Sequence, residues 1–111
     1  MSLIEQAEEV FDRAGDVRSS LEAEDQDEAL MRIHDLRAAV KNVPLAHTLA
    51  GHEEGGSVVQ PVHDVGDTLD SLEYDVSGGK FNGQARRGFD RSVEELGKAT
   101  SYAKGVEEGK P

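Results

Sequence analysis

Apolar residues recur at helical spacing in two stretches of the chain, residues 2–21 and residues 58–76. In each stretch six apolar residues follow one another at steps of 4, 3, 4, 3 and 4. An α-helix has about 3.6 residues per turn, so this spacing places all six on one stripe of a helix. We therefore predict two amphipathic helices. Their stripes consist of Leu3, Ala7, Val10, Ala14, Val17 and Leu21, and of Val58, Val62, Val65, Leu69, Leu72 and Val76.

Two looser stripes of the same kind occur in residues 28–43 and 82–106, and no alternating run of strand length competes with them. Four helices joined by short links predict an all-α fold, an up-down four-helix bundle. The alternative is a long helical hairpin with a kink in each arm. A length of 111 residues fits one domain covering residues 1–111. The predicted core contains Leu3, Val10, Val17, Leu30, Ile33, Val40, Val62, Leu69, Leu72, Phe89 and Leu96.

Start and stop signals flank these stripes. Ser-x-x-Glu and Ser-x-x-Gln capping boxes predict two helix starts, because the Ser hydroxyl accepts a hydrogen bond from a free backbone N–H. Residues 22–28 hold no large apolar side chain, and we expect a turn there. A continuous acidic helix is the alternative, since Glu, Ala and Gln form helices well. The predicted starts are Ser2 with Glu5, Asp25 or Asp27, Ser57 with Gln60, and Asn82, and the predicted stop is residues 77–79.

The chain is acidic, with a formal net charge of −11 that is spread unevenly. Residues 1–28 carry ten acids and two bases, whereas residues 80–111 carry five acids and seven bases. Such a chain repels nucleic acid and anionic membranes, so we expect neither as a partner. The acids suit a solvated or salt-adapted surface, an acidic mimic that occupies a nucleic-acid site on its target, or a face that meets a basic protein.

The acidic excess is concentrated in the turn over residues 22–28. Exposed ion pairs contribute little stability, so internal pairing gives little reason to gather so many acids. Attraction of a basic partner is a better reason, because summed charge raises association rates. We predict that Glu24, Asp25 and Asp27 border an interface with the basic surface of another protein, with a homodimer left open. The acids expected to lack a basic match in the chain are Glu22, Glu24, Asp25, Asp27 and Glu28.

Signs of catalysis are sparse. The chain has no Cys, no Gly-x-Ser-x-Gly, no phosphate-binding loop and no pair of histidines at metal-ligand spacing on one helix face. It also has no apolar run near the roughly 20 residues that cross a bilayer, and an acidic start unlike a signal peptide. We therefore predict a cytoplasmic protein that is not an enzyme, has no assigned metal or cofactor site, and acts by binding another protein. Binding of zinc or nickel at the loop over residues 51–56, through His47, His52 and His63, is the alternative that the sequence leaves open.

Residues 47–51, His-Thr-Leu-Ala-Gly, resemble the phospho-acceptor stretch of histidine phosphotransfer domains. Those domains are acidic four-helix bundles of similar size that read His-x-x-Lys-Gly within a helix. The resemblance implies that His47 is phosphorylated and that the helix containing His63 packs beside it. Ala50 stands where the family has Lys. Histidine phosphotransfer is therefore an alternative function.

Residues 81–85, Phe-Asn-Gly-Gln-Ala, followed by Phe89, resemble the hairpin corner of the small Trp-x-Gly proteins that type VII secretion systems export or partner. The resemblance extends over residues 58–106. It implies a tight link between two antiparallel helices, with Phe81 in the Trp place and Gly83 in the Gly place. Both residues then become candidates for binding, and export by a type VII-like system becomes an alternative location. The family's Tyr-x-x-x-acid tail is not matched, because Val106 stands four residues after Tyr102.

Overall fold

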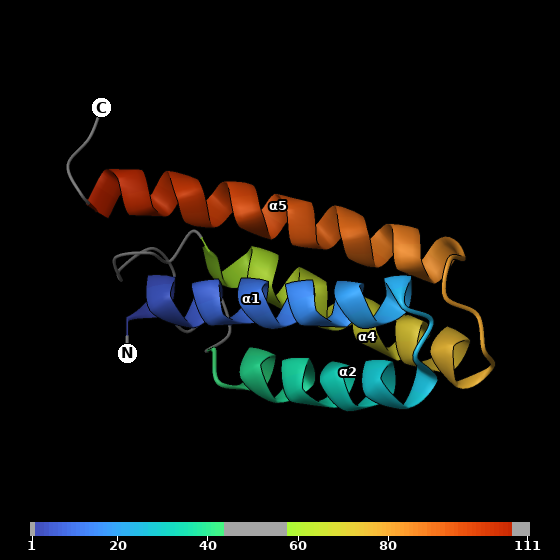
Figure 1. Ribbon diagram of the computed structural model, residues 1–111. Helices are drawn as coiled ribbons and strands as arrows, with labels where there is room; N and C mark the ends of the chain where they lie inside the picture. The colour runs from blue at the N-terminus through green and yellow to red at the C-terminus, as the bar shows by residue number, and fades with distance from the viewer. Residues whose placement is uncertain (1, 44–57, 108–111) are drawn as a thin grey trace.

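The chain folds into an antiparallel helical bundle. The computed structural model describes residues 2–43 and 58–107, which contain four helices and no strand. Figure 1 shows that successive helices run in opposite directions along one bundle axis. This confirms the all-α four-helix bundle, and the alternative of a long kinked hairpin is wrong. The helices are α1 (Leu3–Glu22), α2 (Gln26–Lys41), α4 (Val59–Ser77) and α5 (Gln84–Glu107).

The four helices enclose one aliphatic core. α1 packs against α2 and α5, and α4 packs against the same two helices from the other side. The two strict heptad stripes face inward, so that Val10, Val17, Leu69 and Leu72 have no exposed surface. Phe89 is the largest side chain that is fully buried. Burial of aliphatic area of this kind is the main favourable term in the stability of such a fold.

The predicted register is wrong by one residue at two positions. Leu3 and Leu30 are only half-buried, and the neighbouring Ile4 and Ala29 take the inward positions. Adjacent residues on a helix are about 100° apart, so either member of an apolar pair can continue a stripe. The remaining nine residues of the predicted core are buried: Val10, Val17, Ile33, Val40, Val62, Leu69, Leu72, Phe89 and Leu96.

The first two helix starts follow the sequence signals. The Ser2 hydroxyl accepts a hydrogen bond from the Glu5 N–H at 3.1 Å, and the Ser2 N–H donates to Glu5 Oε1 at 3.2 Å. The pKa of the Glu5 carboxyl is held below its usual range, first by the hydrogen bond from the Ser2 backbone N–H and then by the polar Ser2 side chain beside it. Asp25 caps α2 by accepting from the Glu28 N–H at 3.2 Å. The continuous acidic helix is therefore wrong, and Asp25 rather than Asp27 is the cap.

The other two starts differ from expectation. The cap position of α4 is Val58, which makes no side-chain capping bond, while Ser57 lies outside the described residues. α5 begins at Gln84, because the Gly83 carbonyl accepts the first helical bond from the Arg87 N–H at 3.2 Å. Asn82 is therefore not the cap, and its Oδ1 instead accepts from Arg86 Nη1 at 2.8 Å.

Two further observations complete the fold. α4 stops as predicted, with Gly78 as its C-cap and Gly79 in the left-handed region at φ +81°. Within the described part of the chain, no helix combines the length and the apolar character needed to span a bilayer.

Candidate interaction site at the turn end of the bundle

The two tight links of the bundle lie at the same end of the molecule. Figure 1 shows the α1–α2 turn beside the link between α4 and α5. Gln26, the first residue of α2, donates from Nε2 to the carbonyls of Val76 and Ser77 at the end of α4, both at 2.9 Å. Two candidate sites that the sequence left separate, one acidic and one aromatic, are thus parts of one surface. Up-down order alone could have indicated this, because alternate links of such a bundle share an end.

The acidic turn, which we define as Glu24, Asp25 and Asp27, has an unusual backbone. Glu24 adopts φ +53° and is the only described residue other than glycine with a positive φ. Its N–H donates to the Leu21 carbonyl, and the Asp25 N–H donates to the Ser20 carbonyl, both at 3.1 Å. This is the Schellman pattern, whose left-handed position is usually glycine. The chain places a charged residue there instead, and this residue is exposed to solvent.

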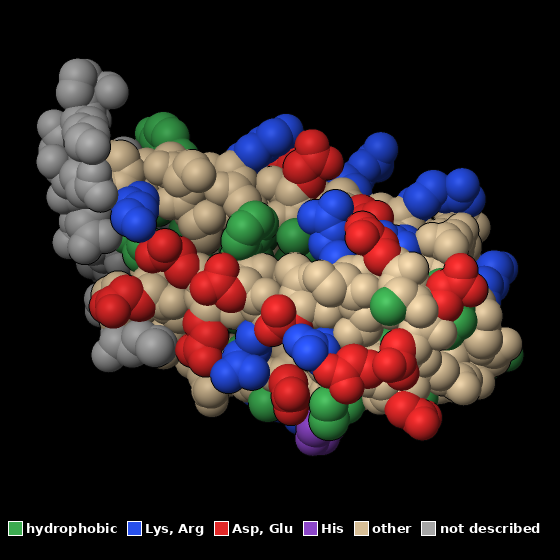
Figure 2. All heavy atoms as spheres, in the orientation of Figure 1, with side chains coloured by type: hydrophobic (Ala, Val, Ile, Leu, Met, Phe, Trp, Pro, Cys, Tyr) green, Lys and Arg blue, Asp and Glu red, His purple; other side chains and the backbone are tan. Residues whose placement is uncertain are grey.

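The three carboxylates of the acidic turn are exposed and have no cation within ion-pair distance among the described residues. The expectation was wrong for two flanking acids. Glu22 lies 3.6 Å from Arg86 Nη2, and Glu28 lies 2.6 Å from Arg32 Nη2. Of the five acids of this segment, Glu24, Asp25 and Asp27 are therefore the ones that lack a cation partner in the described structure. Figure 2 shows Asp and Glu gathered over α1 and α2, with Lys and Arg along the outer edge of α5.

Phe81 and Gly83, which we call the aromatic corner, mainly pack against the rest of the bundle. Phe81 is half-buried against the core, and Gly83 is buried. A Cβ on Gly83 would lie 2.5 Å from Lys80 Cε and 3.2 Å from Asp75 Oδ2, so a larger residue there would displace the flexible end of the Lys80 side chain. The structure therefore places both residues in the wall of the bundle end, where part of the Phe81 ring remains accessible.

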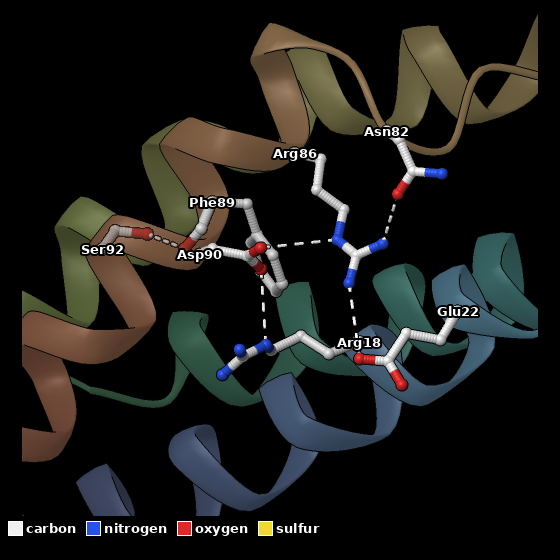
Figure 3. Close-up of polar contacts among 7 residues, drawn as sticks. All are labelled: Arg18, Glu22, Asn82, Arg86, Phe89, Asp90 and Ser92. Atoms are coloured by element: carbon white, nitrogen blue, oxygen red, sulfur yellow. Dashed lines mark hydrogen bonds and ion pairs between the residues drawn. The ribbon is translucent and has the colours of Figure 1, made fainter.

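A polar cluster joins this end of α5 to α1, and sequence reasoning missed the part of it that Asp90 makes. Asp90 lies 3.3 Å from Arg18 Nε and 3.4 Å from Arg86 Nε, as Figure 3 shows. The Arg86 side chain is only 12% exposed and also contacts Asn82 and Glu22. Such a partly buried network fixes the position of α5 beside the last turns of α1. The i, i+4 spacing of Arg86 and Asp90 was the available signal.

A groove of about 500 Å³ runs between α4 and α5, lined among others by Ser71, Lys80, Ala85 and Gly88. In residues 2–43 and 58–107 no three His, Cys, Asp or Glu side chains are placed to hold a metal ion. His63 Nε2 donates to the Val43 carbonyl at 2.9 Å. His47, the predicted phospho-acceptor, lies outside the described residues, so that alternative stays a prediction.

Comparison with protein-family models, with curated proteins and with solved structures finds no match to this chain. The resemblances to Trp-x-Gly proteins and to histidine phosphotransfer domains therefore stay predictions.

Proposed function

We propose that this chain is a non-catalytic binding module whose acidic turn docks on the basic surface of another protein. The observation that carries the proposal is the set of three exposed carboxylates, Glu24, Asp25 and Asp27, without a cation partner in the described structure. A cytoplasmic setting fits the cysteine-free sequence. Among the described residues no observation favours histidine phosphotransfer or nucleic-acid mimicry over this function.

Two physical arguments support the acidic turn as the contact. Carboxylates held close together make the local electrostatic potential more negative. This speeds encounter with a positively charged partner, and the gain falls as the salt concentration rises. A residue other than glycine in the left-handed region is strained, and such strain is often retained where the side chain has a function. Glu24 combines both features, since glycine would relax the backbone but remove a charge.

The test uses the native partner, captured from the host, and measures association rates at low and high salt. We expect the triple variant Glu24→Gln, Asp25→Asn, Asp27→Asn to associate about tenfold more slowly at low salt, and the difference to vanish at high salt. Asn at position 25 keeps the cap of α2, because Asn and Asp cap helices about equally well.

The matched control is Asp12→Asn, Asp67→Asn, Glu94→Gln, which removes the same charge from three exposed acids elsewhere. We expect a much smaller change in the association rate for this control. Equal effects of the two triple variants would show that net charge alone matters. An unchanged rate at low salt would reject the acidic turn as the contact.

A further inference from the structure

The outer face of α2 carries an exposed apolar side chain between two carboxylates. Met31 is 54% exposed, although most large apolar side chains of the described chain are buried. Asp27 lies one helical turn before it and Asp35 one turn after it, so the three share one face of α2. Both carboxylates are exposed and lack an ion-pair partner among the described residues. In Figure 2 hydrophobic and acidic side chains lie close together along the lower edge of the molecule, where α2 runs, next to a histidine.

The neighbouring positive charges are already engaged. A groove of about 190 Å³ beside Met31 contains Arg13 and Arg32. Arg13 lies 3.0 Å from Glu9, and Arg32 lies 2.6 Å from Glu28 and 3.5 Å from Asp16. The charges left unpaired next to Met31 are therefore negative. The carboxylates of Asp27 and Asp35 belong to residues about 12 Å apart along the helix axis, at 1.5 Å per residue.

We propose that the strip Asp27–Met31–Asp35 docks an amphipathic helix of the partner, with an apolar side chain on Met31 and a Lys or Arg one turn to each side. This inference rests on the proposed function and adds the partner's chemistry to it. Asp27 belongs both to the strip and to the acidic turn, so the two surfaces are continuous. Methionine suits such a contact, because its long unbranched side chain adapts to different apolar partners.

A second copy of this chain fits the strip poorly. The outer edge of α5 presents Arg87 and Arg91, both exposed and without an ion pair in the described structure. Glu94 and Glu95 follow before the next cation, Lys98. A copy that placed Arg91 and Lys98 on the two carboxylates of the strip would set a Glu against Met31. In the described part of α5 no apolar side chain has a cation four residues to each side, so the strip fits a helix of another protein better than a second copy.

The probe for the test is a synthetic alanine-rich helical peptide with a central Leu and a Lys four residues to each side. It is titrated into the ¹⁵N-labelled full chain, and affinity is measured at two salt concentrations. We expect amide shifts over residues 27–35. Met31→Ala should weaken binding about fivefold or more, because buried Met area is lost, with the salt dependence unchanged. Asp27→Asn with Asp35→Asn should weaken binding and flatten the salt dependence.

Two controls match these variants. Tyr74→Ala removes an exposed apolar side chain from α4, and Asp67→Asn with Glu94→Gln removes two exposed charges elsewhere. Both should stay within about twofold of the parent chain, well under the tenfold that 1.4 kcal/mol represents. The peptide with Gln in place of Leu should bind the parent chain as weakly as the Leu peptide binds the Met31→Ala variant.

Three results would overturn the proposal. Shifts confined to residues 23–27, with Met31→Ala binding normally, would reject the strip and leave the acidic turn as the contact. Absence of peptide binding would reject the strip, while the association rates with the native partner decide the proposed function separately. Shifts at Met31 that depend on protein concentration without peptide would assign the face to a second copy.

Discussion

Glu24 illustrates how a single residue departs from the local rule. α1 and α4 both end in a Schellman motif, with Glu24 in the left-handed position of the first and Gly79 in that of the second. A side chain in this conformation costs about 1 kcal/mol, because its Cβ crowds the following carbonyl. Both turns have the same backbone hydrogen bonds, so the turn with Gly79 shows the unstrained form of the turn with Glu24.

We therefore expect Glu24→Gly to raise the free energy of unfolding by about 0.5–1 kcal/mol, measured by urea denaturation. Glu24→Gln, which keeps a side chain at the strained position, should leave stability nearly unchanged. If both variants stabilise the chain equally, charge repulsion rather than backbone conformation is responsible.

At the scale of single residues the sequence predicted what depends on near neighbours. The Ser2–Glu5 box and the Asp25 cap each require contacts only three residues apart. Asn82 failed as a cap because Arg86, which the α1–α5 cluster holds in place, takes its side-chain oxygen. The left-handed backbone at Glu24 could not be predicted either, since no glycine marked it.

α2 and α4 approach each other closely at one glycine, Gly66. A Cβ on Gly66 would lie 2.9 Å from Val40 Cγ1, so the glycine lets the helices approach. By contrast, a Cβ on Gly88 of α5 would meet nothing within 4 Å. The two helical glycines therefore have different reasons to be present. One serves packing, and nothing in the structure explains the other.

Gly66→Ala should lower the free energy of unfolding by about 1 kcal/mol, because overpacking by about 1–3 kcal/mol outweighs a helix-propensity gain of about 1 kcal/mol. Val40→Ala should cost less in the Gly66→Ala background than alone, which a double-mutant cycle measures. Gly88→Ala is the control, expected to stabilise by about 0.5–1 kcal/mol. Stabilisation by Gly66→Ala as well would show that no close contact exists.

Helix number and order were readable from the apolar spacing, whereas the fine register was not. The 4, 3, 4, 3, 4 stripes determine a helix face uniquely only where a single apolar residue occupies each position. At Leu3–Ile4 and Ala29–Leu30 two apolar neighbours compete, and tertiary packing decides between them. Close approach at Gly66 was equally hidden, because it depends on which residue of α2 lies opposite.

At the scale of the whole molecule, the fully buried hydrophobic side chains among the described residues are aliphatic, apart from Phe89. Leu69 is fully buried in it. Leu69→Ala should lower the free energy of unfolding by about 2–5 kcal/mol, because it leaves a cavity in a close-packed interior. Leu30→Ala, at a half-buried position, should have a clearly smaller effect. A loss below about 0.5 kcal/mol for Leu69→Ala would contradict its burial.

The candidate site was predicted in parts but not as one surface. Composition indicated the acidic turn, and the aromatic corner was found by its glycines. That the two share one end follows from the topology. The hydrogen bond from Gln26 to the end of α4 could not be predicted from the sequence. An uncharged side chain in an acidic run gives no sign of a partner 50 residues away. Met31 went unnoticed because a single exposed apolar residue carries no periodic signal.

The bonds made by Gln26 and His63 have a consequence for internal motion. Gln26 reaches from the α1–α2 hairpin to the end of α4, and His63 reaches from the α4–α5 hairpin to the Val43 carbonyl after α2. Each hairpin thus makes a hydrogen bond to the other at one end of the interface between α2 and α4, which we call the seam. When one of these bonds breaks, the hairpins can part there while the opposite end stays joined. The two ends of the seam should therefore exchange their amide hydrogens as separate units, each opening independently of the other and below the threshold for global unfolding.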